Sequence, residues 1–163
     1  MKLGKKTKIF LAGHNGMVGS AILKKLKVNG YKNIIIRNRE QLDLLDQNKT
    51  YKFLKRNSPK LVIIAAAKVG GIIANMNNKS KFLYENLQIQ NNLIHGSYSA
   101  GIKNLFLLGS SCIYPKFSKQ PMKEEYLLTG SLEETNDAYA LAKIAGIKMC
   151  EHYSEAYNLN YKG

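Results

Sequence analysis

The sequence predicts an α/β fold, a doubly wound parallel sheet with helices on both faces. Three observations predict it. Short apolar runs alternate with longer amphipathic segments along the whole chain, as strands and helices would. A glycine-rich stretch, residues 13–19, lies between the first such run and the first such segment. The run at residues 61–67 is continuously apolar, which is typical of a central strand covered on both faces.

Four buried strands are predicted where aliphatic and β-branched residues are concentrated. They are residues 7–12, 33–36, 61–67 and 105–108. Small residues after the third strand, Gly70 and Gly71, would let the backbone lie against a ligand. The last residues, 158–163, come where a helix should lead into a further strand, so we expect the chain to be an amino-terminal fragment of a longer protein.

Four helices are predicted between and after these strands. The first has an apolar side within residues 21–28. Asp46 is the predicted N-cap of the second, because aspartate oxygens accept hydrogen bonds from first-turn N–H groups, and Pro59 ends that helix. The third covers residues 79–100 and includes His95, which we assign to packing or capping. The fourth carries Tyr139 and Lys143.

Length and composition indicate one domain, because 163 residues with 45% hydrophobic content can bury a single core. No apolar run approaches the roughly 18 residues that a membrane span needs. The run at residues 9–12 is too short for a secretion signal. Cys112 and Cys150 do not make a disulfide framework, and no Cys/His spacing suggests a metal site. We therefore expect a soluble protein of the reducing cytoplasm.

The net charge of +14 is uneven along the chain. Residues 1–60 hold fifteen Lys and Arg against three acids, and the remainder holds ten against eight. These basic residues are dispersed and are not interleaved with stacking aromatics, so we expect no nucleic-acid partner. Small polyanionic ligands account for part of the excess.

The glycines at positions 13, 16 and 19 form a G-x-x-G-x-x-G motif between a strand and a helix. Glycines there permit a tight turn and let backbone N–H groups approach a pyrophosphate at the helix N-terminus. The alternative is an ordinary glycine-rich turn. About twenty residues on, Arg37 and Arg39 follow the second strand. Arginine at that place accommodates the 2′-phosphate of NADP, although both could be solvated charges at a strand end.

Tyr139 and Lys143 stand four residues apart, so on a helix they share one face. A cation near a phenol lowers its pKa from about 10, and such a pair can protonate a carbonyl oxygen while hydride reaches the carbon. The alternative is a core tyrosine beside a lysine that reaches to water. Ser110 and Cys112 follow the fourth strand. Ser110 could bind the same oxygen and Cys112 could act as a thiol acid or base, or both could serve the turn and burial.

The stretches GHNGMVGSAI, AAAKVGGI, GSSCIYPK and YALAKIAGIK resemble the extended short-chain dehydrogenase/reductase family, and the similarity covers essentially the whole chain. The resemblance implies a Rossmann-type NADP-binding domain over residues 1–163, followed by a smaller substrate-binding part. Within the family the motifs look most like the enzymes that epimerise and then reduce GDP-4-keto-6-deoxy-mannose to GDP-L-fucose with NADPH. It also implies a homodimer in full-length form and no membrane partner.

The resemblance assigns a role to each catalytic candidate. Tyr139 would protonate the C4 oxygen, and Lys143 would lower its pKa and hold the nicotinamide ribose. Ser110 would bind the C4 oxygen, and Cys112 would move protons at the epimerised carbons. The implied cofactor-binding residues are Gly13, His14, Asn15, Gly16, Met17, Val18, Gly19, Arg39, Glu40, Gln41, Leu42, Asp43, Leu44, Leu108, Gly109, Ser110, Ser111 and Lys143.

Two departures from the family pattern leave alternatives open. Asn15 stands where the family often has an arginine, so affinity for the 2′-phosphate would rest on Arg37 and Arg39. The family's histidine acid/base and most residues that grip the GDP-sugar would lie beyond position 163. Another nucleotide-sugar epimerase or dehydratase is therefore an alternative, as is a non-catalytic NADP-binding or redox-sensing module.

Overall fold

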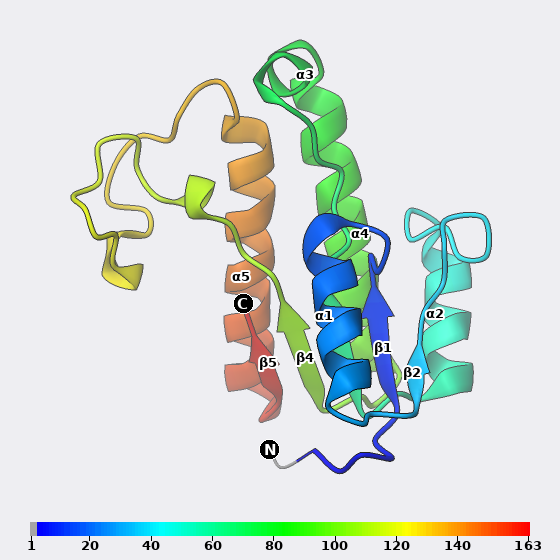
Figure 1. The fold of residues 1–163 in the computed structure, drawn as a ribbon. Helices are drawn as coiled ribbons and strands as arrows, with labels where there is room; N and C mark the ends of the chain where they lie inside the picture. The colour runs from blue at the N-terminus through cyan, green and yellow to red at the C-terminus, as the bar shows by residue number, and fades with distance from the viewer. Residues whose placement is uncertain (1–2) are drawn as a thin grey trace.

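Five parallel strands form the centre of the computed structural model, which describes residues 3–163 (Figure 1). The order across the sheet is β2-β1-β3-β4-β5, and every neighbouring pair is parallel. The strands are β1 (Ile9–Ala12), β2 (Ile34–Ile35), β3 (Leu61–Ile64), β4 (Asn104–Leu107) and β5 (Asn160–Lys162). The chain therefore runs outward from β1 in both directions, which creates a switch point beside that strand.

The helices cover the two faces of this sheet unequally. They are α1 (Met17–Val28), α2 (Gln47–Asn57), α3 (Ile72–Asn77), α4 (Lys79–Ser99) and α5 (Asp137–Tyr157). On one face Ile9 and Leu11 of β1 pack with the apolar side of α1. On the other face Phe10 of β1 belongs to a larger core shared with α2, α4 and α5. Both faces of β1 are thus buried, which explains its uninterrupted apolar run and confirms the doubly wound prediction.

The predicted boundaries of the second helix are confirmed by its caps. The Asp46 carboxylate accepts a hydrogen bond from the Lys49 N–H at 2.9 Å. At the other end Ser58 adopts a left-handed conformation (φ +41°), and its N–H donates to the Leu54 carbonyl at 2.8 Å. Pro59 follows directly and cannot continue the helix. None of the helices described for residues 3–163 is long and apolar enough to cross a membrane.

Two features differ from the sequence prediction. The third strand ends at Ile64, and the alanines after it leave the sheet. The six-residue helix α3 is too short to have shown a helical period. The fifth strand forms within residues 158–163, where a further strand was expected, although its sequence, Asn-Tyr-Lys, contains no apolar run. Between β4 and α5 the chain also makes a long excursion beside α5, with 3₁₀ turns at Ser111–Ile113 and Glu124–Tyr126 (Figure 1).

Tyr161 anchors the fifth strand. Its side chain is buried, with 1% of its surface exposed, and its hydroxyl donates to the Ile102 carbonyl at 2.8 Å. Burial raises the pKa of this phenol above its usual value. The hydroxyl of Ser154 on α5 donates to the Tyr161 carbonyl and accepts from the Tyr161 N–H, at 2.8 and 3.0 Å. These bonds tie a strand of only three residues to the segment before β4 and to α5.

We predict that Tyr161→Phe lowers the free energy of unfolding by about 1–2 kcal/mol, because the buried Ile102 carbonyl loses its donor. Urea denaturation measures the change. The matched control is Tyr84→Phe, since Tyr84 is 64% exposed and should change stability by less than about 0.5 kcal/mol. Equal effects of the two substitutions would contradict the anchoring role.

Candidate functional site

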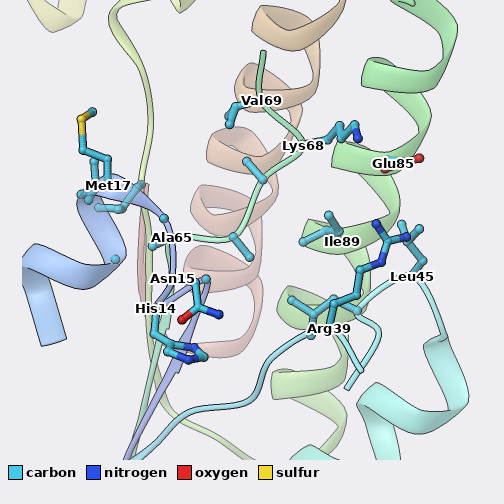
Figure 2. Close-up of a pocket in the computed structure, with 18 of the residues that line it drawn as sticks. His14, Asn15, Met17, Arg39, Leu45, Ala65, Lys68, Val69, Glu85 and Ile89 are labelled. Carbon is cyan, nitrogen blue, oxygen red and sulfur yellow. The ribbon is translucent and has the colours of Figure 1, made fainter. Parts of the chain in front are cut away.

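A cavity of about 640 Å³ opens at the carboxyl ends of the strands (Figure 2). Its walls come from the loops after β1, β2, β3 and β4, together with residues of α4 and α5. Open α/β sheets bind ligands at this edge, beside the switch point. The volume also lies in the range of cofactor sites. The cavity is therefore the candidate functional site.

The loop after β1 forms one wall and allows no side chain at two positions. Gly13 has a φ of +86°, and a Cβ there would lie 2.4 Å from the Ala66 nitrogen. A Cβ on Gly19 would lie 2.0 Å from the Gly13 carbonyl oxygen. Helix α1 begins at Met17, and within residues 3–163 no side chain caps its first-turn N–H groups. These N–H groups, at the positive end of a twelve-residue helix, could bind an anion.

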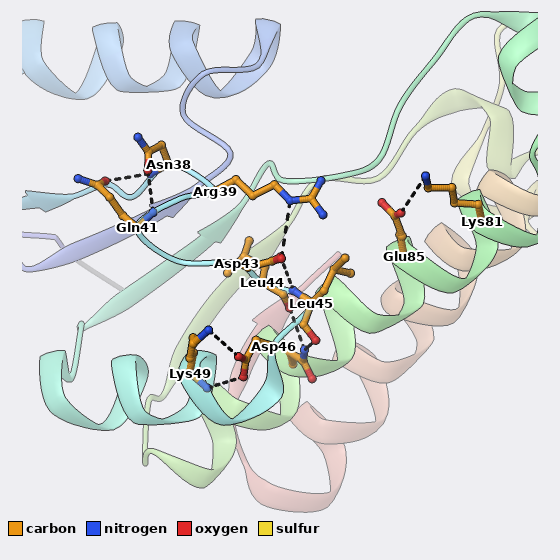
Figure 3. Close-up of polar contacts among 11 residues, drawn as sticks. Asn38, Arg39, Gln41, Asp43, Leu44, Leu45, Asp46, Lys49, Lys81 and Glu85 are labelled. Atoms are coloured by element: carbon orange, nitrogen blue, oxygen red, sulfur yellow. Dashed lines mark hydrogen bonds and ion pairs between the residues drawn. The ribbon is translucent and has the colours of Figure 1, made fainter.

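The loop after β2 brings charged side chains to the cavity (Figure 3). Arg39 extends toward the α4 side, and its Nε lies 3.7 Å from Asp43 Oδ2. The side-chain oxygens of Asn38 and Gln41 each accept from the other residue's N–H, at 2.9 and 3.1 Å, which fixes the turn. Arg37 also lines the cavity, with its guanidinium 5.6 Å from the centre of the Phe53 ring.

The loop after β3 is clamped by Asn86 of α4. The Asn86 Oδ1 accepts from the Lys68 N–H at 2.7 Å, and its Nδ2 donates to the Lys68 carbonyl at 2.9 Å. Because Asn86 is buried, this pair of bonds holds the loop against α4. The loop contributes Ala65, Ala66 and Ala67 and both Lys68 and Val69 to the cavity.

Tyr139, Lys143 and Ser110 lie together at the end of the cavity nearest β4 and α5. Lys143 is 4% exposed, and its Nζ donates to the Leu108 carbonyl at 2.8 Å. The same Nζ lies 5.8 Å from the centre of the Tyr139 ring. Cys112 does not line the cavity, but its thiol donates to the Ser110 hydroxyl at 3.2 Å. A phenol, a hydroxyl and an ammonium thus converge, with a thiol directly behind them.

The pKa of Tyr139 moves in the direction opposite to the sequence prediction. Burial raises it above 10, the neighbouring Cys112 raises it further, and a hydrogen bond with Ser110 acts in the other direction. The Lys143 ammonium donates to the Leu108 carbonyl and not to the Tyr139 hydroxyl, so burial decides the direction of the shift. Burial lowers the pKa of Lys143 itself. At neutral pH Tyr139 therefore keeps its proton and could donate it.

Most of the predicted site residues line this one cavity, and four do not. Gln41 is exposed and occupied with Asn38, Glu40 and Ser111 are exposed, and Cys112 lies behind Ser110. Gly70 and Gly71 also lie outside it. The cavity is also lined by residues that were not predicted, namely Asn38, Leu45, Ala65, Ala66, Ala67, Lys68, Val69, Glu85 and Ile89. The alanines could have been found, since they follow a predicted strand as Gly13 and Ser110 do.

The fold and the cavity define a Rossmann-type α/β unit with its ligand site at the switch point. The chain belongs to the NAD dependent epimerase/dehydratase family, whose sequence profile matches residues 9–163. It is 55% identical over 151 residues to a putative GDP-L-fucose synthase 2 of Arabidopsis thaliana, which covers 93% of this chain and 46% of that protein. It is 48% identical to the GDP-L-fucose synthase of Escherichia coli, covering 96% and 49%.

Among solved structures, the chain is similar to a GDP-D-glycero-L-gluco-heptose synthase from Campylobacter jejuni, crystallised in the presence of NADPH. The TM-score is 0.93 at 40% identity, over 98% of this chain and 46% of that one. The chain spans about half the length of the curated relatives that it matches.

Proposed function

We propose that residues 1–163 form the NADP-binding domain of an enzyme that epimerises and then reduces GDP-4-keto-6-deoxy-mannose to GDP-L-fucose. The observation that carries the proposal is that one cavity holds the glycine loop, Arg39 and the Tyr139/Lys143 pair. The names of the Arabidopsis and Escherichia coli relatives support the reaction. The Campylobacter enzyme, which has a similar fold, was crystallised in the presence of NADPH.

The order of groups along the sheet edge suits an extended dinucleotide. Arg39 follows β2, the glycine loop follows β1, and Ser110 follows β4, so the strand order places them in that succession. From β2 to β4 is three strand spacings, or about 14 Å. Arg39 would hold the 2′-phosphate, first-turn N–H groups of α1 the pyrophosphate, and Lys143 the nicotinamide ribose. When bound, NADPH supplies the hydride for reduction.

The residues at the far end of this succession would then handle protons. Tyr139, protonated at neutral pH, would donate its proton to the C4 oxygen of the sugar. Ser110 would hydrogen-bond the same oxygen. Lys143 has three N–H donors and gives one to Leu108, so two are left for ribose hydroxyls. Cys112, held by Ser110, would exchange protons at the carbons next to the ketone.

The same cavity is compatible with other sugars, so a second candidate function is that of another nucleotide-sugar epimerase or dehydratase. The Campylobacter structure is named for a heptose, so the fold does not choose the substrate. Cys112 favours the epimerase/reductase, because reduction alone needs no thiol. A non-catalytic NADP-binding module is less favoured, since it would not require the buried Lys143 or its approach to Tyr139. The proposal includes a homodimer and a cytoplasmic location, and the free thiols of Cys112 and Cys150 are compatible with a reducing compartment.

We predict that the chain binds NADPH at least about tenfold more tightly than NADH, because a charge-assisted bond from Arg39 to the 2′-phosphate contributes on that order. Fluorescence titration measures both dissociation constants. Arg39→Gln should reduce the preference. Arg56→Gln, an exposed arginine of α2 outside the cavity, should leave it unchanged. Equal affinities in the unaltered chain would overturn the assignment of Arg39.

We also predict that the two steps separate in a protein of the relatives' full length that contains this chain. Cys112→Ser should slow the exchange of the sugar C3 and C5 protons with deuterated water, because a hydroxyl is a far weaker acid than a thiol and is not deprotonated near neutral pH. It should leave NADPH binding intact, since Cys112 does not line the cavity. Cys150→Ser is the control, because that thiol is buried and its pKa is raised to about 12. Unchanged exchange in Cys112→Ser would show that the Cys112 thiol does not transfer these protons and serves only in packing.

A further inference from the structure

Glu85 of α4 is an acidic side chain that the proposed reaction does not use. Its side chain is only 11% exposed, and it lines the cavity. The nearest cation is Lys81, whose Nζ lies 3.8 Å from Glu85 Oε1, which is too far for a hydrogen bond. Within residues 3–163 no donor hydrogen-bonds to this carboxylate. The Glu85 oxygens are not among the fully buried atoms, so they reach the cavity and can accept from a donor on a ligand.

The position of Glu85 restricts which part of a dinucleotide it could meet. It lies one turn before Ile89, so both occupy one face of α4 and both line the cavity. One wall of the cavity is apolar and is formed by Ile89 together with Leu44, Leu45 and Ala65. Arg39 extends toward this side from the opposite loop (Figures 2 and 3). Glu85 therefore borders the end of the cavity at which Arg39 would hold the 2′-phosphate.

We propose that Glu85 accepts a hydrogen bond from the exocyclic 6-amino group of the adenine ring and so selects adenine over 6-oxo purines. This inference rests on the proposed binding of NADPH. A flat base suits the apolar wall formed by the leucines, Ala65 and Ile89. The adenosine 2′-phosphate offers two donors, the 6-amino group and the 3′-hydroxyl. The 3′-hydroxyl is next to the phosphate dianion, which would repel a carboxylate, so the 6-amino group is the partner.

Asp43, the other acid in the cavity, is less suited to this role. Its Oδ1 accepts from the Leu45 N–H at 3.1 Å, and its Oδ2 pairs with Arg39 at 3.7 Å. Asp43 thus already accepts a hydrogen bond that shapes its own loop, whereas the Glu85 carboxylate accepts none within residues 3–163. A 6-oxo purine would instead place a carbonyl oxygen, a second acceptor, where adenine has its amino group. Its N1–H lies beside that contact and not in it, so the 6-oxo purine should bind more weakly.

The test compares NADPH with its hypoxanthine analogue, reduced nicotinamide hypoxanthine dinucleotide phosphate, by fluorescence titration of the 163-residue chain. The unaltered protein should bind NADPH about tenfold or more tightly than the analogue. In Glu85→Gln the ratio should fall close to one, because an amide can accept from an amino group or donate to an oxo group. Glu155→Gln, an exposed acid of α5 outside the cavity, should keep the original ratio.

The outcomes separate this inference from the proposed function. If the unaltered chain binds NADPH but does not discriminate against the analogue, Glu85 does not read the base. If Glu85→Gln keeps the original ratio, another group such as Asp43 reads it, and the inference is wrong. If the unaltered chain binds neither nucleotide, the proposed NADP site itself is overturned.

Discussion

The structure depends on one close backbone approach, between the loop after β1, the loop after β3 and the start of α1. A Cβ on Gly13 would lie only 2.4 Å from the Ala66 nitrogen, and a Cβ on Gly19 only 2.0 Å from the Gly13 carbonyl oxygen. This contact turns the chain directly from strand into helix, so the N-terminus of α1 faces the sheet edge. It also leaves the space above β1 and β3 free, and that space is the cavity. Larger residues at these two positions would separate the loops and misplace the helix N-terminus.

Along the cavity, the groups change from those that bind charge to those that could move protons. Arg37 and Arg39 lie at the β2 side, uncapped N–H groups lie in the middle, and Tyr139, Ser110 and Lys143 lie at the β4 side. The two ends differ in burial as well as chemistry. The Arg39 side chain is largely exposed, whereas Lys143 is enclosed and bonded to Leu108. The exposed Arg39 side chain can change conformation to contact a phosphate. The enclosed Lys143 side chain is held in one position beside the Tyr139 phenol.

The sequence could predict what depends on local pattern. Apolar runs predicted four strands, the Asp46 cap and Pro59 bounded α2, and the spacing of Tyr139 and Lys143 put both on one helix face. The α/β alternation indicated a further strand at residues 158–163, but not the bounds of β5, because Tyr161 is held by tertiary bonds to Ile102 and Ser154 and not by an apolar run. Glu85 and Ile89 were missed because which face of α4 meets the cavity depends on helix packing. The predicted direction of the Tyr139 pKa was wrong because burial of the phenol, which depends on tertiary packing, raises the pKa.

The central claim is that this cavity binds NADPH with the pyrophosphate at the glycine loop. Hydrogen exchange of the backbone amides, followed by mass spectrometry with and without NADPH, tests it most directly. NADPH should slow exchange in residues 13–19 and 65–69, which line the cavity. Exchange in residues 115–131 should not change, because these residues border a separate hollow in the excursion after β4. Unchanged exchange at residues 13–19 under saturating NADPH, or protection confined to residues 115–131, would contradict it.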